Sequence, residues 1–389
     1  MKIALVINEF NIRGGTHKQL HRLCEFLLKN KYETTIFTKF YNPLNCYPGN
    51  ELFKIVSYDE RYQKVNKTKG WRRLIKTVIL DWTIANDISK YATIVNIHDS
   101  GLEFINIFLI FKFKQIPIVW QINDLHPAFN IGNSKDLKVN KLLLYYKSIV
   151  KYIAKNNSAI TVNVSKNVQR VKEYLNCDAY LFHCGVDIRN NSFRPSKVNE
   201  NSITLMSTGV FFTFRNYETL LKIQKYLQEK FNLIVNSIIV GSTAMDEVYV
   251  NKIRSIIKED KLDCSIRGDI SEKQLLEIYY KADFFLFLNV DQSWGLSVFE
   301  SMNMCIPTIV SKSVGAVELL QNGKTALIVD PLNHEKIGDL IYEYYKKPAL
   351  RDELINQAFN ESLKMSWDSM YCSKMLGLFH SVVKNQHNH

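Results

Sequence analysis

A short apolar run in the second half of the chain is followed by a helical pattern. Residues 284–288 (FFLFL) have the length and composition of a strand that is buried on both faces. A polar loop with one glycine spans 289–295, after which Val298, Phe299 and Met302 recur at the spacing of one helix face. We therefore predict a buried strand, a loop and a helix in this order.

The same alternation of apolar runs and amphipathic patterns continues along the chain, with an Asn-, Ser- and Pro-rich stretch at 189–201 as the candidate linker. The predicted strands are 2–8, 32–37, 93–97, 116–122, 160–164, 180–182, 203–207, 234–240, 263–267, 284–288, 307–310 and 326–329. The predicted helices are 17–28, 71–84, 138–155, 166–175, 217–230, 246–259, 272–281, 296–303, 315–321, 333–346, 349–365 and 367–383.

This alternation predicts the α/β class, with two doubly wound Rossmann-like domains that face each other across a cleft. We expect the first domain over 1–190, the second over 202–365, and a C-terminal helix over 366–389 that crosses back to the first domain. A length of 389 residues agrees with two domains, because it exceeds what one ordinary core holds.

Composition predicts a globular protein of the cytoplasm. The chain is 46% hydrophobic and 23% charged, and its seven cysteines are scattered without a CxxC pair or a Cys/His cluster. The first ten residues, MKIALVINEF, contain Glu9 and are typical of a strand and not of a signal peptide. No stretch approaches the ~20 apolar residues of a membrane span.

Positive charge is concentrated in the first half. Residues 1–195 hold 29 Lys and Arg against 15 Asp and Glu, a net charge of +14, whereas residues 196–389 hold 21 against 23, a net charge of −2. Two predicted amphipathic helices carry much of this charge. Such faces suit an anionic membrane surface at the inner side of the membrane, or else are solvated faces of core-packed helices. Nucleic acid is disfavoured, because no zinc-finger, RRM or helix-turn-helix signature is present.

The residues of these two helices fall into apolar and basic sets. The first helix sets Leu74, Val78 and Trp82 beside Arg72, Arg73 and Lys76, and the second sets Leu142, Tyr146, Ile149 and Ile153 against Lys141, Lys147, Lys151 and Lys155.

Glycines and polar residues at predicted strand ends are the candidate binding groups. Gly295 allows close approach of a ligand to the backbone, and Glu300 can accept two hydrogen bonds from a vicinal diol such as a ribose, unless it is an ordinary surface residue. The loop at 11–16 holds Gly14 and Gly15, which either present amides to a ligand or only make a turn. It is not a GxGxxG motif, so a Rossmann dehydrogenase is disfavoured.

These residues resemble the motifs of GT-B glycosyltransferases of the retaining family four, also called glycosyl transferases group 1. The run from Gln292 through Glu300 to Pro307 (QSWGLSVFESMNMCIP) is similar to that family's two-glutamate motif. The segments GDISEKQLLEIYYKAD and VGAVELLQNGKTALIVDP resemble its base-binding and following segments. In the first half, IVNIHDSGLEFIN and PIVWQINDLHPAF are similar to its strand ends. The resemblance covers nearly the whole chain.

The resemblance implies a role for each matching residue. Arg215 matches the cation that holds the donor diphosphate, and Glu300 matches the carboxylate that holds the ribose. The implied catalytic residues are Arg215, Asn123, Gln292 and Asp124. The implied donor-binding residues are Gly15, Gly209, Arg215, Gly268, Gln292, Trp294, Gly295, Leu296, Ser297, Val298 and Glu300. Gly14, Thr16 and His98 are implied on the acceptor side. No metal, cofactor or protein nucleophile is implied, because cations and a helix N-terminus hold the phosphates.

Three positions depart from the family's usual residues. Gln292 replaces the first glutamate, Asn123 replaces a histidine, and Val210 replaces an arginine. The resemblance implies a retaining glycosyltransferase that moves a sugar from a nucleotide diphosphate sugar to a glycan or lipid-linked acceptor in surface polysaccharide or glycoconjugate assembly. The departures leave open a catalytically silent GT-B subunit that binds glycan or a partner enzyme. A nucleotide-sugar epimerase is a third possibility.

Overall fold

The computed structural model describes residues 1–98, 116–123, 141–189, 192–193, 201–244, 246–268, 270–290 and 294–386, with the side chains of 141–147 and 386 left aside. Two compact units divide the chain. Unit 1 contains Met1–Cys184 and Trp367–His389, and unit 2 contains Gly185–Ser366. The residues at 185–189, which we expected at the end of the first domain, belong to unit 2 because Val186 pairs with Ser366 as an isolated β-bridge.

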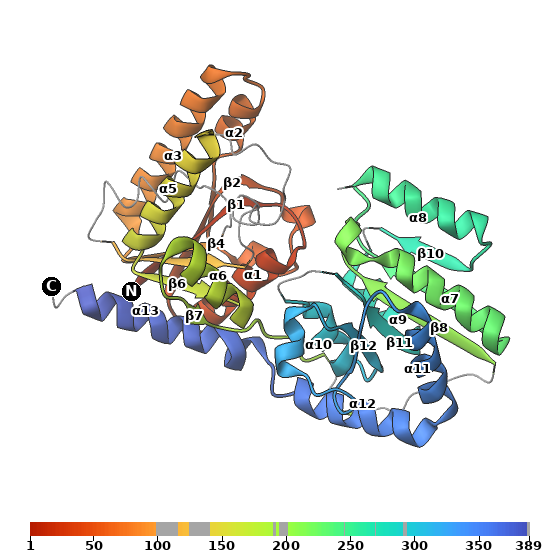
Figure 1. The fold of residues 1–389 in the computed structure, drawn as a ribbon. Helices are drawn as coiled ribbons and strands as arrows, with labels where there is room; N and C mark the ends of the chain where they lie inside the picture. The colour runs from red at the N-terminus through yellow and green to blue at the C-terminus, as the bar shows by residue number, and fades with distance from the viewer. Residues whose placement is uncertain are drawn as a thin grey trace. The chain divides into compact units, whose positions relative to one another are not determined.

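Unit 1 is built on a parallel sheet, which in its described residues has seven strands in the order β3-β2-β1-β4-β5-β6-β7 (Figure 1). Its strands are β1 (Lys2–Phe10), β2 (Glu33–Tyr41), β3 (Ile55–Ser57), β4 (Ile94–His98), β5 (Ile118–Ile122), β6 (Ala159–Val162) and β7 (Tyr180–Leu181). Its helices are α1 (Gly15–Lys29), α2 (Asp59–Asn66), α3 (Trp71–Tyr91), α5 (Lys141–Asn156), α6 (Ser165–Leu175), a π-helical turn η6 (Asp368–Cys372) and α13 (Ser373–Gln386).

Unit 2 repeats this plan with a parallel sheet of six strands in its described residues, in the order β10-β9-β8-β11-β12-β13 (Figure 1). Its strands are β8 (Ser202–Thr208), β9 (Ile234–Val240), β10 (Cys264–Arg267), β11 (Phe284–Phe287), β12 (Thr308–Ser311) and β13 (Leu327–Val329). Its helices are α7 (Tyr217–Phe231), α8 (Glu247–Glu259), α9 (Glu272–Lys281), α10 (Leu296–Asn303), α11 (His334–Lys346) and α12 (Pro348–Ser362), with 3₁₀ turns η4 (Thr213–Arg215) and η5 (Gly315–Leu319).

The two parallel sheets with intervening helices confirm the predicted α/β class. Sequence periodicity also placed α10 at its observed residues, because the buried strand β11 and the apolar face of the helix both lie in the core of unit 2. It was wrong at 315–321, where the chain forms a 3₁₀ turn and not an α-helix. It also missed β3, which has only three residues, and α2, which is short and mostly polar.

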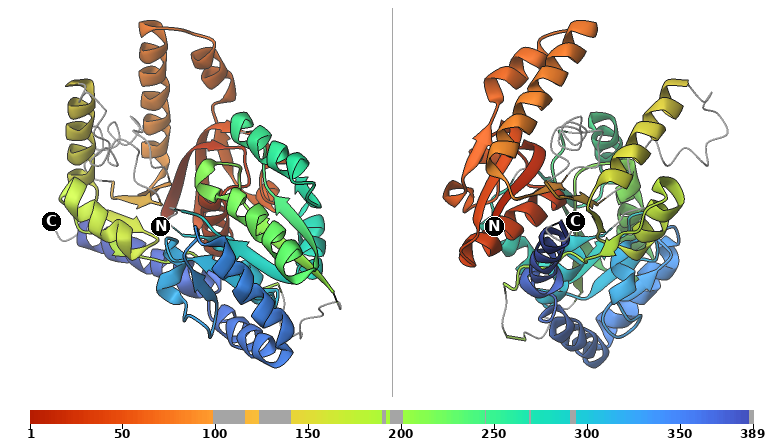
Figure 2. Two further views of the ribbon diagram at one scale, coloured as in Figure 1. Left: turned by 45° about the vertical axis from the view of Figure 1, so that its right-hand side comes forward. Right: turned by 90° about the vertical axis from the view of Figure 1, so that its left-hand side faces the viewer.

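Helix α3 differs most from its predicted outline. It runs to Tyr91, and its core-facing side consists of Leu80, Ile84, Ala85 and Ile88. The predicted apolar face therefore points away from the core of unit 1. In both views of Figure 2, α2 and α3 extend as a pair beyond the end of the sheet of this unit.

The C-terminal helix belongs to unit 1. The Tyr371 hydroxyl donates to Gln121 Oε1 on β5 at 3.1 Å, and the Tyr32 hydroxyl lies 2.8 Å from His380 Nε2. These contacts account for the assignment of Trp367–His389 to the first unit, although the whole of unit 2, Gly185–Ser366, precedes it in the sequence. Among the described residues we find no helix with the length and apolar character to cross a bilayer.

Candidate functional site

The turn between β11 and α10 requires a glycine. Gly295 has φ of +120°, and a Cβ at this position would lie 2.9 Å from the Phe287 ring and 3.1 Å from Val314. Trp294 is buried and stacks on Phe299 with ring centroids 5.3 Å apart. This contact joins the residue before Gly295 to the helix after it. The backbone at the start of α10 is therefore held in one shape.

The predicted amide donors of this turn do not all face the surface. Gly295 and Val298 are buried, and the Val298 N–H donates to Gly295 O at 3.1 Å. Leu296 and Ser297 are partly exposed in the first turn of the helix, where N–H groups lack partners within the helix itself. Leu296 and Ser297 are thus the better placed of the four to meet an anionic ligand.

Glu300 lies on the second turn of α10 and is partly buried. The Tyr279 hydroxyl, from α9, donates to Glu300 Oε2 at 3.4 Å. Burial, followed by the nearby Glu300 charge, raises the pKa of Tyr279 well above its ordinary value, so the phenol stays protonated and can donate. Sequence analysis missed Tyr279, because nothing in the pattern of α9 shows which residue of α10 it meets.

Arg215 lies close to the same turn. Gly209 has φ of +148°, and a Cβ there would be 2.6 Å from Cζ of Arg215, so the guanidinium covers this glycine. The Arg215 Cζ lies 5.2 Å from the centroid of the Phe214 ring and 5.8 Å from that of Phe287. Since Phe287 also contacts Gly295, one aromatic ring brings two predicted donor-site groups together.

Gly241 is a further glycine that this arrangement requires. A Cβ at Gly241 would lie 1.9 Å from the carbonyl oxygen of Gly209. A side chain here would therefore collide with the backbone that follows β8. Gly241 directly follows β9, and a glycine placed directly after a predicted strand was the signal that could have identified it. Gly268 follows β10 at the same sheet edge, and a Cβ there would meet no atom within 4 Å.

Two of the predicted catalytic residues, Gln292 and Asp124, lie outside the described residues. Their roles stay predictions.

Asn123, at the end of β5, donates both hydrogens of its side-chain amide inside unit 1. The acceptors are Thr16 Oγ1 at 3.0 Å and Gln19 Oε1 at 2.9 Å. Its Oδ1 accepts from Gln121 at 3.0 Å, and its carbonyl oxygen accepts from Asn167 at 2.7 Å. Asn123 therefore fixes the start of α1 relative to the sheet.

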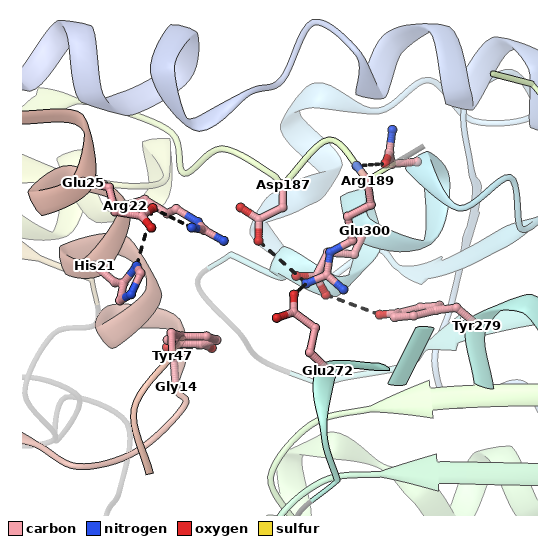
Figure 3. A network of polar contacts seen from close by, with 11 residues as sticks. Gly14, His21, Arg22, Glu25, Tyr47, Asp187, Arg189, Glu272, Tyr279 and Glu300 are labelled. Carbon is pink, nitrogen blue, oxygen red and sulfur yellow. Dashed lines mark hydrogen bonds and ion pairs between the residues drawn. The ribbon is translucent and has the colours of Figure 1, made fainter. Parts of the chain in front are cut away.

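The glycine loop of unit 1 adopts ordinary backbone angles. Gly14 caps α1 with φ of −101° and ψ of 169°, and Gly15 begins the helix. The Gly14 carbonyl oxygen accepts from the Lys18 N–H at 2.9 Å. It also accepts from the Tyr47 hydroxyl at 3.4 Å; Gly14 and Tyr47 are labelled in Figure 3. Neither residue is needed here for a left-handed conformation.

His98, at the end of β4, is 1% exposed. Burial, and then the nearby His17, lower its pKa to about 3, so the ring is neutral at physiological pH. Its Nε2 hydrogen is donated to Asn96 Oδ1 at 2.6 Å, because the Asn96 amide nitrogen itself donates to Val119 O. A neutral, buried ring is suited to hydrogen bonding and not to carrying charge.

Family and sequence comparisons point to one class of protein. Residues 188–361, nearly all of unit 2, match the family described as Glycosyl transferases group 1. The mannosylfructose-phosphate synthase of Agrobacterium fabrum is 26% identical over 157 residues, which are 39% of this chain and 34% of that protein. A sucrose synthase of Melioribacter roseus is 26% identical over 168 residues, 39% of this chain and 21% of the relative. The chain thus matches at most about a third of these relatives.

Solved structures show the fold over the full chain. A sucrose-phosphate synthase from Thermosynechococcus elongatus superposes with a TM-score of 0.78 at 16% identity, covering 99% of this chain and 100% of the other. A glycosyltransferase from Rickettsia africae gives 0.76 at 16% identity and 99% of both chains. Anabaena HepE, solved with UDP and glucose, gives 0.76 at 13% identity, with 98% of this chain and 100% of the other covered.

Proposed function

Because residues 188–361 match the family described as Glycosyl transferases group 1 and the chain has the GT-B fold, we propose that the protein is a retaining hexosyltransferase. It takes a sugar from a nucleotide diphosphate sugar and passes it to a glycan or lipid-linked acceptor in surface polysaccharide or glycoconjugate assembly. One observation carries the proposal. The Arg215 guanidinium and Gly295 both lie against the Phe287 ring, and Glu300 lies on α10, whose N-cap is Gly295.

The chemistry follows from these groups. The Arg215 guanidinium stabilises the charge that develops on the diphosphate as the bond from the anomeric carbon to the phosphate oxygen breaks. The acceptor hydroxyl oxygen attacks that carbon on the same face, and its proton passes to the departing phosphate oxygen. Glu300 accepts hydrogen bonds from the ribose hydroxyls, as a carboxylate can. No metal and no protein nucleophile takes part in this scheme.

A ligand screen is the direct test. Thermal shift against UDP-, GDP- and ADP-sugars should raise the melting temperature for one nucleotide class, because a ligand that binds only the folded state stabilises it. The UDP complex of Anabaena HepE makes UDP-sugars the first to try. If no nucleotide or nucleotide sugar shifts the transition at millimolar concentration, the proposal is wrong.

We also propose that unit 1 binds an anionic membrane surface at the cytoplasmic face. Five large apolar side chains of α3 are between 44% and 68% exposed: Trp71, Leu74, Ile75, Ile79 and Trp82. They recur at helical spacing, beside Arg72, Arg73 and Lys76. Apolar groups that enter the interface and cations that meet lipid phosphates suit such a surface, with ~1 kcal/mol for each basic residue.

Vesicle co-sedimentation tests this partner. Binding should require phosphatidylglycerol in phosphatidylcholine vesicles, and Trp71→Ser with Leu74→Ser should reduce it. Val248→Ser is the matched control, because Val248 is 82% exposed on a helix of unit 2. Equal binding to neutral vesicles, or equal loss in the control, would exclude an electrostatic membrane site on α3.

One observation favours a second candidate, a catalytically silent subunit. Asn123 stands where the resemblance expects a histidine, and both of its amide hydrogens are donated within unit 1. The combined change Asn123→His and Gln292→Glu separates the candidates. An inert parent that gains sugar transfer would identify a silent subunit, whereas an active parent would exclude it.

A further inference from the structure

Arg189 joins the first segment of unit 2 to two of its helices. The main-chain N–H of Arg189 donates to Asn303 Oδ1 at 2.8 Å, at the last residue of α10. Its guanidinium Nη2 lies 2.6 Å from Glu272 Oε1, at the first residue of α9, and 3.7 Å from Asp187 Oδ2. The side chain is only 15% exposed, so these contacts are shielded from water more than a surface ion pair is.

The same guanidinium lies near the Tyr279–Glu300 hydrogen bond. Figure 3 shows the Arg189 guanidinium between Asp187 and Glu272, with the Tyr279 hydroxyl directed at Glu300. Burial is the main cause of the raised pKa of Tyr279; the Glu300 charge raises it further, and the Arg189 charge opposes this. Both charges therefore act on one buried hydroxyl group.

Two carboxylates, Asp187 and Glu272, form ion pairs with this guanidinium, and Glu300 lies beside them (Figure 3). In the absence of the cation they would repel one another, and the turns that carry them would move apart. Asn303 lies one turn after Glu300 on α10, and its Nδ2 donates to Ser362 Oγ on α12 at 3.3 Å. Arg189 thus holds the α9 start and the α10 end at fixed places on either side of Glu300.

We propose that Arg189 is a positioning residue for the ribose subsite of the donor nucleotide. It acts through Glu300, whose carboxylate it keeps oriented for a cis-diol, and it does not contact the phosphates or the sugar that is transferred. The proposal rests on the proposed function, because it assumes that Glu300 receives the ribose of a nucleoside diphosphate.

The test compares two ligands that differ only in the diol. Dissociation constants are measured by calorimetry for the nucleoside diphosphate, among UDP, GDP and ADP, that gives the largest thermal shift with the parent protein, and for its 2′,3′-dideoxy form. Arg189→Ala should weaken binding of the first ligand about tenfold, which is ~1.4 kcal/mol. Binding of the dideoxy form should change less than twofold, because the contact that Arg189 supports is already missing.

Arg189→Lys keeps the charge and loses the planar fork, so it should give an intermediate loss and serves if the alanine variant does not fold. Lys225→Ala is the matched control. It removes a 2.6 Å ion pair with Asp260 elsewhere in unit 2 and should leave both dissociation constants unchanged. In turnover, Arg189→Ala should raise the donor KM with little change in kcat.

Two outcomes overturn the proposal for different reasons. If the parent protein discriminates the two ligands and Arg189→Ala weakens both equally or neither, the positioning role is wrong and the proposed function stands. If the parent protein binds no nucleoside diphosphate, the proposed function fails and the positioning role fails with it.

Discussion

The carboxyl-end edges of the two parallel sheets differ in how their polar side chains are used. In unit 2, the described residues at this edge include charged groups that are partly open to solvent, with Arg215 against the Phe287 ring and Glu300 beside Tyr279. In unit 1, Gln121 and Asn123 direct their hydrogen bonds to each other and to α1, and His98 is buried and neutral.

This difference shows that the doubly wound topology alone does not decide which charged groups lie at the strand ends. The plan gathers strand ends along one edge in both units. Unit 2 adds a guanidinium, glycines that let backbone segments approach closely, and a carboxylate held by a buried phenol. Unit 1 adds a network of uncharged amides whose hydrogen bonds rigidify the loop at the start of α1. The predictions below test whether the two edges have these separate tasks.

Arg215→Ala should have the largest effect. Removing one charge that stabilises a departing diphosphate should lower kcat roughly 100- to 1,000-fold, because the stabilisation is greatest in the transition state. Steady-state kinetics with the donor identified in the thermal-shift screen would measure this. Arg215→Lys should recover part of the rate, because lysine keeps the positive charge but lacks the planar guanidinium with its several N–H donors. An unchanged kcat in Arg215→Ala would remove this residue from the site.

Glu300→Ala should act mainly on donor binding. Loss of the carboxylate removes two charge-assisted hydrogen bonds to the ribose, so we expect the donor KM to rise roughly 30- to 100-fold. The change in kcat should be smaller, because the ribose does not react. Glu300→Gln should be milder, as an amide oxygen still accepts. A variant with the parent's KM would show that α10 carries no ribose subsite.

Local patterns predicted the β11–α10 unit and Gly295 because everything needed lies within about twenty residues of sequence. Period and length placed the helix, and the close approach at Gly295 follows from its place in a buried turn. The resemblance added Arg215, whose guanidinium the structure brings to the same aromatic ring as Gly295. The binding roles of these residues stay predictions.

Long-range contacts account for what the sequence could not predict. Arg189 meets Asn303 across 114 residues, and no local pattern encodes that meeting. In α3, apolar residues occupy two faces, so periodicity alone could not decide which face packs on the sheet. Leu80 and Ile84 are buried against the core of unit 1, whereas Leu74 is exposed. The partners of Asn123 likewise depend on how α1 docks against β5.

Gly241→Ala should disturb the charged edge of unit 2 through the backbone. The added methyl would lie 1.9 Å from the Gly209 carbonyl oxygen, so the segment that leads to Arg215 must shift. We expect about 2 kcal/mol lower unfolding free energy, in the range of overpacked cores, measured by denaturant titration. Gly268→Ala is the control for stability, because its methyl would meet no atom within 4 Å. Equal stability of both variants would mean that the β8 end is free to move.

The buried, neutral His98 at the described end of β4 in unit 1 predicts a smaller effect, a pH dependence of stability. The pKa of His98 is lowered to about 3 in the folded protein, against about 6.5 for an unperturbed histidine. The unfolded chain therefore binds a proton that the folded protein rejects, and this contribution destabilises the fold as the pH falls through 6.5 toward 3. Between pH 6.5 and pH 5 the loss of unfolding free energy should be about 1.5 kcal/mol.

Asp283, whose pKa burial raises to about 6, changes stability in the opposite direction, so the parent and His98→Gln must be compared at each pH. The glutamine variant starts less stable because the ring is lost, yet its unfolding free energy should fall less steeply over this range. Parallel curves for the two proteins would show that His98 takes up its proton in the folded state, and that this buried ring can carry a charge.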